Sequence, residues 1–173
     1  MTLATQTPVS TNPQLGLTNE ARHGVIEILQ TTLADEMVLY TRLRNYHWNV
    51  TGPQFQSLHE LFEKQYTQLA ETIDETAERI RAYGAYAKGT MTEFVQMSRL
   101  EERPNNYPTA QEMIRELAED NEMLVRALRE DIDTVDDNYD DVGAEDFLTA
   151  LLQDHQEMAW MLRTFISGPA VHD

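Results

Sequence analysis

The sequence predicts an all-α protein, a four-helix bundle with a short extra helix in the long connection between its second and third helices. Two observations predict it. From Thr18 onward, apolar residues recur at steps of three and four, which is the period of an amphipathic helix. No segment keeps the apolar–polar alternation, bounded by turn residues, that is typical of strands.

The first two long helices are expected to form a pair joined by a tight turn. The first should cover about residues 19–47 and end before Gly52 and Pro53, since a Gly-Pro pair breaks a helix. The second should cover about residues 55–84. Their apolar stripes are Val25, Leu29, Leu33, Met37, Tyr40 and Leu43 in the first helix, and Leu58, Phe62, Leu69, Ile73, Ile80 and Tyr83 in the second.

The second pair of long helices follows a long connection, in which residues 91–100 favour a short helix. A capping-box pattern over residues 109–112 predicts the start of the third long helix, which we expect to give way to the acidic run of residues 133–141. The fourth should follow Gly143 and stop before residues 167–169. This connectivity is that of a ferritin-like bundle over residues 18–167, with a flexible N-terminal tail (1–17) and a short C-terminal tail (168–173).

Composition narrows the possible functions. The 173 residues contain 30 Asp and Glu against 13 Lys and Arg, a net charge of −17, and no Cys. Thiol catalysis, disulfides and thiolate metal sites are therefore excluded, and the charge favours cationic partners over nucleic acid. With no secretory signal or membrane-spanning run of apolar residues, we expect no membrane contact and a cytoplasmic location, with association with the nucleoid as the alternative.

The chain contains only five histidines, so each can be considered in turn as a metal ligand. His23 belongs to the only Glu-x-x-His motif of the chain, whereas a di-iron site inside one bundle needs two. We therefore expect no such intra-bundle site and interpret His23 as a surface residue. His155 lies on an apolar stripe, where core packing is favoured over metal binding. His172 falls in the C-terminal tail.

The candidate metal site consists of five residues, which are His47, His59, Glu63, Asp74 and Glu78. The last four share one face of the second helix, but the rise of about 1.5 Å per residue puts about 16 Å between Glu63 and Asp74. One metal ion cannot reach both pairs in one chain. An antiparallel two-fold mate crossing near residues 68–69 would bring them together, and the imidazole–carboxylate set would suit Fe(II), Mn(II) or Zn(II). Periodicity alone leaves a chance alignment of surface carboxylates as the alternative.

Three stretches carry a resemblance to a known family: residues 45–55 (NYHWNVTGPQF), 58–63 (LHELFE) and 73–79 (IDETAER). They resemble the Dps family, the ferritin-like mini-ferritins that protect DNA during starvation. The resemblance implies that His47, His59 and Glu63 come from one subunit and Asp74 and Glu78 from its two-fold mate. It places Trp48 and Trp160 near the site, with aromatic core packing as the alternative for both. Glu63 departs from the commoner Asp of the family.

The resemblance also implies an activity and an assembly. The chain would be a ferroxidase that oxidises Fe(II), with up to two ions per inter-subunit site, using hydrogen peroxide or dioxygen. Ferric mineral would be stored in a hollow homo-dodecamer built from two-fold dimers, with Asp141, Glu145 and Asp146 as candidate residues of the three-fold pores. Residues 1–19 contain no Lys or Arg, so we do not expect direct DNA binding. The alternative function is that of a nucleoid-associated protein that protects DNA by binding and covering it. A third hypothesis is a helical shell whose site binds a redox-inert metal.

Overall fold

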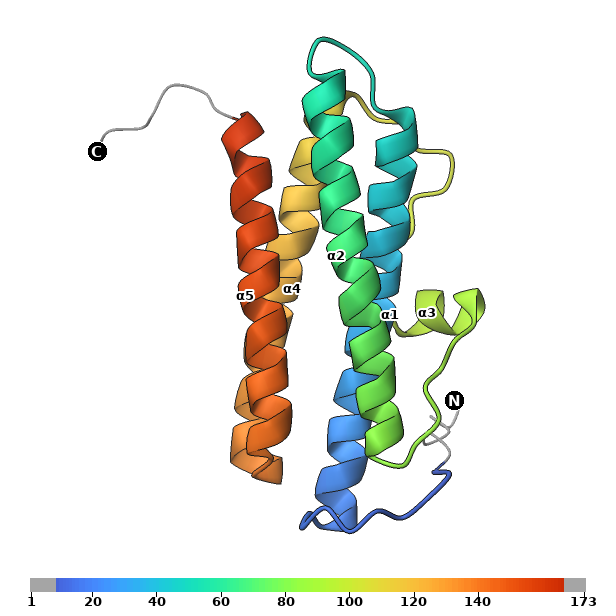
Figure 1. The fold of residues 1–173 in the computed structure, drawn as a ribbon, viewed down its shortest axis with the longest axis vertical. Helices are drawn as coiled ribbons and strands as arrows, with labels where there is room; N and C mark the ends of the chain where they lie inside the picture. The colour runs from blue at the N-terminus through green and yellow to red at the C-terminus, as the bar shows by residue number, and fades with distance from the viewer. Residues whose placement is uncertain (1–8, 167–173) are drawn as a thin grey trace, which may run out of the picture.

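The computed structural model describes residues 9–166 and confirms the all-α bundle. Four long helices, α1 (Asn19–Asn49), α2 (Phe55–Ala82), α4 (Ala110–Tyr139) and α5 (Val142–Ile166), run side by side (Figure 1). The short helix α3 (Met91–Met97) lies beside α1. α1 pairs with α2 and α4 pairs with α5, while the connection through α3 carries the chain from one end of the bundle to the other (Figure 1).

Local chemistry sets most helix ends where the sequence predicts them. Thr109 accepts a hydrogen bond from Glu112 N, and the Glu112 side chain accepts one from Thr109 N, so the predicted capping box begins α4. A second capping box at Thr90 and Glu93 begins α3. Between α1 and α2, Gly52 has a φ of 106°, which an L side chain rarely adopts.

The end of α4 differs from the prediction. The helix does not give way at residue 133 but continues to Tyr139, because Val135 is fully buried and Tyr139 packs against Gly24. Asp140 then ends it in the left-handed conformation, with a φ of 50°. α5 begins at Val142, so Gly143 lies within its first turn rather than before it.

Residues 9–17, for which the sequence predicted a flexible tail, contact the far end of α2. The backbone N–H groups of Ser10 and Thr11 both donate to Gly84 O, and Arg22 donates to the carbonyls of Thr11 and Tyr83. The other residues of the expected tails, 1–8 and 168–173, lie outside the described part of the chain. Within residues 9–166, no helix offers a stretch apolar and long enough to cross a membrane.

The core consists of two apolar groups with a polar layer between them. One group, near the α1–α2 turn, includes Leu43 and Phe62; the other, at the opposite end, includes Ile26, Ile80 and Leu148. The buried polar side chains between the two groups include Glu36, Thr72, Thr76, Asn121 and His155.

Glu36 is an acidic residue buried in this polar layer. It is 1% exposed, Thr76 Oγ1 donates to its Oε2 at 3.3 Å, and Oε1 has no hydrogen-bond partner among the described residues. Burial raises the pKa of Glu36 from 4.5 to about 8, and the nearby carboxylates of Asp35 and Asp154 also act to raise it. Glu36 is therefore a neutral acid at pH 7.

The connection between α3 and α4 is fixed to the bundle by two ion-pair clusters. In the first, Arg42 pairs with Asp120 and donates to Glu101 O, and both side chains of the pair are buried. Arg103 pairs with Glu116 at 2.6 Å, and the Tyr46 hydroxyl donates to the same carboxylate.

In the second cluster, Asp35 accepts hydrogen bonds from Ser98 and Arg99, and Arg99 also pairs with Asp131 at 2.8 Å. The clusters therefore tie the connection to both α1 and α4.

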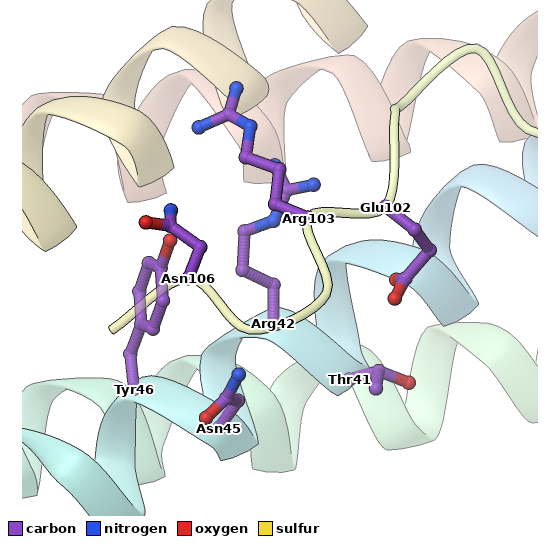
Figure 2. Close-up of a pocket in the computed structure, with 7 residues that line it drawn as sticks. All are labelled: Thr41, Arg42, Asn45, Tyr46, Glu102, Arg103 and Asn106. Carbon is purple, nitrogen blue, oxygen red and sulfur yellow. The ribbon is translucent and has the colours of Figure 1, made fainter. Parts of the chain in front are cut away.

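Figure 2 shows the cavity where this connection meets α1. It is lined by Thr41, Arg42, Asn45 and Tyr46 from α1 and by Glu102, Arg103 and Asn106 from the connection. Its two guanidinium groups are already compensated by Asp120 and Glu116. The cavity therefore offers no net positive charge to an anionic ligand, and we assign its polar side chains to holding the connection.

Replacing one partner of the buried ion pair should lower the free energy of unfolding far more than replacing one partner of an exposed pair. Arg42→Met leaves the buried Asp120 carboxylate without its partner and should lower the free energy of unfolding by about 3–5 kcal/mol. Arg163→Met, whose pair with Glu122 is 50% and 42% exposed, should cost at most about 1 kcal/mol. Urea unfolding followed by circular dichroism measures both; equal losses would contradict a structural role for the Arg42 cluster.

The pKa of Glu36 predicts a particular pH dependence of stability. Its value in the fold, about 8, exceeds the ordinary 4.5, so its contribution is full below pH 4.5 and is lost as pH rises to 8, by up to about 1.4 kcal/mol per pH unit. Glu36→Gln should abolish this loss. The difference in thermal midpoint between the variant and the wild type should therefore shift in favour of the variant as the pH is raised from 4.5 to 8. The exposed Glu119→Gln is the control, and an unchanged pH profile in Glu36→Gln would refute the assignment.

Candidate metal centre

His47 and His59 face each other across the turn between α1 and α2. His47 belongs to the last turn of α1 and is 8% exposed, and His59 lies on the first turns of α2. Their rings stack with centroids 3.7 Å apart and an interplanar angle of 18°. The structure thus brings together two predicted ligands that are twelve residues apart in the sequence.

Reciprocal hydrogen bonds fix both imidazoles. His47 Nδ1 lies 2.8 Å from His59 O, and His59 Nδ1 lies 2.9 Å from His47 O. Because a carbonyl oxygen only accepts, each Nδ1 must carry the proton and donate it. In the neutral imidazole, Nε2 then keeps a free lone pair, and the Nδ1–H to carbonyl contact is the usual outer partner of a metal-binding histidine.

Glu63 follows His59 by one helical turn. Its side chain is exposed, and its Oε1 accepts a hydrogen bond from the Tyr66 hydroxyl at 3.3 Å. The Tyr66 ring meets the His47 ring edge-on, with centroids 5.2 Å apart. Phe55 lies 5.0 Å from His59, centroid to centroid. Each histidine of the pair thus has an aromatic ring packed against it.

Asp74 and Glu78 lie farther along α2, and both side chains are exposed. The helix is continuous from Phe55 to Ala82, so the axial separation of about 16 Å between Glu63 and Asp74 holds in the structure. Within residues 9–166, no three His, Asp or Glu side chains lie close enough together to hold one metal ion. In the described chain, Glu63 therefore does not complete a three-ligand group with the two histidines, and Asp74 and Glu78 lie apart from all three.

The two tryptophans do not belong to the core of this chain. Trp48 is 65% exposed and Trp160 is 58% exposed, so the alternative of aromatic core packing is wrong for the single chain. Trp48 contacts the Arg44 guanidinium, whose central carbon lies 5.3 Å from the ring centroid. Trp160 lies on α5, and its expected place near the site remains a prediction.

His155 is a core residue, as the sequence favoured. It is 2% exposed, and its Nδ1 lies 2.9 Å from Asn121 Oδ1. Burial lowers the pKa of His155 from 6.5 to about 4, which keeps the ring neutral at pH 7. His23 is half-buried on α1, and His172 lies outside the described residues.

The three acidic pore candidates differ in their local roles. Asp141 Oδ1 accepts from the backbone N–H groups of Gly143 and Ala144, and its Oδ2 accepts from the Tyr83 hydroxyl. Asp141 therefore caps α5, a structural role that the sequence did not indicate. Glu145 is half-buried in the first turn of α5, and Asp146 is exposed beside it. A pore lined by these side chains remains a prediction.

Sequence reasoning missed three residues next to the histidine pair. The Arg44 guanidinium carbon lies 4.9 Å from the Tyr66 ring centroid and 5.6 Å from that of Tyr40. Arg44 Nη1 also donates to the Tyr40 hydroxyl at 2.7 Å. The spacing of Tyr40, Arg44 and Trp48, four residues apart on one face of α1, could have indicated the contacts within that helix. It could not have indicated the contact with Tyr66, which lies on α2.

Comparison with known proteins agrees with this architecture. A family model described as "Ferritin-like domain" matches residues 26–168. A low-temperature-induced protein of Nostoc sp., itself uncharacterized, is 46% identical over 91% of this chain and 88% of its own length. DNA protection during starvation protein 2 of Bacillus anthracis is 41% identical over 83% of this chain and 97% of its own length.

Solved structures give the same result. The structure of DpsC from Streptomyces coelicolor superposes with a TM-score of 0.88 at 25% identity, covering 99% of this chain and 100% of that one. A Dps protein from Bacillus brevis gives a TM-score of 0.81 at 32% identity, covering 87% and 99%. The fold, the matched domain and these relatives together establish that the chain belongs to the Dps family of ferritin-like proteins.

Proposed function

We propose that this protein oxidises Fe(II) at sites shared by two copies of the chain and stores the ferric product inside a hollow assembly. The observation that carries the proposal is the histidine pair, in which reciprocal hydrogen bonds to backbone carbonyls leave both Nε2 atoms free to bind a metal. Membership of a family of ferritin-like proteins supports iron as that metal. Borderline imidazole ligands and hard carboxylates also suit Fe(II).

The site requires a second copy of the chain to be complete. His47, His59 and Glu63 would bind iron from one subunit, and Asp74 and Glu78 from its two-fold mate. The face of α2 between the two halves supports a close helix crossing, because Thr67 and Ala70 are small and exposed there. A two-fold crossing at this point pairs each half with its complement twice, which gives two equivalent sites per dimer.

The proposed reaction transfers two electrons together. Two Fe(II) ions reduce one hydrogen peroxide, with two protons, to two water molecules and become two Fe(III) ions. Because both electrons reach the peroxide at one site, no hydroxyl radical is released. The side chains hold the two ions and balance their charge, and no side-chain nucleophile is needed. Dioxygen would be a slower oxidant.

The charge distribution supports iron rather than DNA as the partner. A net charge of −17 attracts Fe(II), and Glu145 and Asp146 are placed to guide it if they line a pore in a dodecamer. Protection of DNA by direct binding is the less favoured alternative function. The relative from Bacillus anthracis is named for DNA protection, but residues 1–19 of this chain contain no basic residue to contact phosphates.

Removing either imidazole tests the proposal. His59→Ala and His47→Ala should each lower the initial rate of peroxide-driven Fe(II) oxidation at least about tenfold, because each removes one metal ligand. The ultraviolet absorbance of the ferric product, followed by stopped flow after anaerobic Fe(II) loading, measures the rate. His23→Ala, which changes a histidine outside the site, should oxidise Fe(II) at the wild-type rate.

Size-exclusion chromatography shows whether each variant keeps its assembly, so that a lost rate can be assigned to the site. Wild-type rates in both site variants would contradict the proposal. Metal binding without any oxidation in the wild type would instead favour a site for a redox-inert metal.

A further inference from the structure

Glu63 has a hydrogen-bond donor that its place in the metal site does not account for. The Tyr66 hydroxyl donates to Glu63 Oε1 at 3.3 Å, across one turn of α2. Both residues are accessible in the chain, Glu63 being exposed and Tyr66 half-buried, so burial does not force them together. The contact joins a predicted metal ligand to a phenol three residues farther along the same helix.

The Tyr66 ring is held by three neighbours. Its ring and that of His47 are 5.2 Å apart with an interplanar angle of 83°, and its ring and that of Tyr40 are 6.1 Å apart at 89°. The Arg44 guanidinium lies 4.9 Å from its centroid. Arg44 is itself fixed by its hydrogen bond to the Tyr40 hydroxyl and its contact with Trp48. Edge-to-face and cation–π contacts of this kind restrict the orientation of a ring.

A ring held in this way fixes the place of its hydroxyl group. Glu carries one more rotatable bond than Asp, so its carboxylate samples more positions around an exposed helix. A hydrogen bond to Oε1 limits that freedom and leaves Oε2 available to a metal ion. Positioned ligands bind more tightly because less freedom is lost on binding.

We propose that Tyr66 is a positioning residue, which holds the Glu63 carboxylate toward the metal bound by His47 and His59. Tyr66 does not touch the metal itself, and Arg44 and Tyr40 act through it by fixing the ring. This role rests on the proposed function, because it concerns the same metal site.

The test is a double-mutant cycle with Co(II) as the probe. Tyr66→Phe keeps the ring and removes only the hydroxyl, and it should weaken Co(II) binding about 3–10-fold. The same change should raise the KM for Fe(II) more than it lowers kcat. In a Glu63→Asp background, Tyr66→Phe should change neither the Co(II) affinity nor the KM for Fe(II) by more than about twofold, because the shorter carboxylate does not reach the hydroxyl.

Co(II) affinity is read from its visible absorption, and Fe(II) oxidation from the ferric absorbance. Tyr107→Phe, at a tyrosine in the connection that is 71% exposed, is the matched control and should behave as the wild type. An equal loss in the wild-type and Glu63→Asp backgrounds, or no loss in either, would overturn the positioning role while leaving the ferroxidase intact. A wild type that neither binds Co(II) nor oxidises Fe(II) would overturn both.

Discussion

The reciprocal hydrogen bonds between His47 and His59 are the interaction on which the rest of the site depends. Each ring donates to the other residue's carbonyl, so the pair joins the end of α1 to the start of α2 and sets both tautomers at once. Tyr66 packs against His47, and Phe55 packs against His59. The histidine half of the proposed shared site is thus preorganised by backbone atoms beside the same tight turn that pairs the two helices.

A second constraint is the rise of the helix. α2 is continuous, and about 1.5 Å per residue keeps Asp74 and Glu78 far from the histidines of their own chain. The side chains inside the bundle do not take the place of Asp74 and Glu78 as metal ligands. The polar layer holds Glu36 as a neutral acid and His155 as a neutral base, a set adapted to burial rather than to a bound cation. Metal chemistry therefore belongs between chains in our proposal, and the interior serves packing.

The sequence predicted the fold well because helical periodicity indicates each long helix, whereas the candidate ligands rest on spacing and on the family resemblance and stay a prediction. Steps of three and four residues indicated every long helix, and the spacing from His47 to Glu78 indicated a site divided between chains. The end of α4 was missed because the burial of Val135 and the packing of Tyr139 on Gly24 depend on tertiary contacts. The Arg44 and Tyr66 contacts likewise depend on how α1 and α2 lie against each other, which spacing within one helix does not reveal.

The most direct test of a shared site is to mix two inactive chains. One variant, His47→Ala with His59→Ala, lacks the histidine half, and the other, Asp74→Asn with Glu78→Gln, lacks the acidic half. In a mixed dimer, one of the two sites draws both intact halves from different chains. Co-expression in equal amounts should therefore restore Fe(II) oxidation at about a quarter of the sites. If the mixed assemblies form and remain inactive, the two halves do not meet between chains and the shared site is refuted.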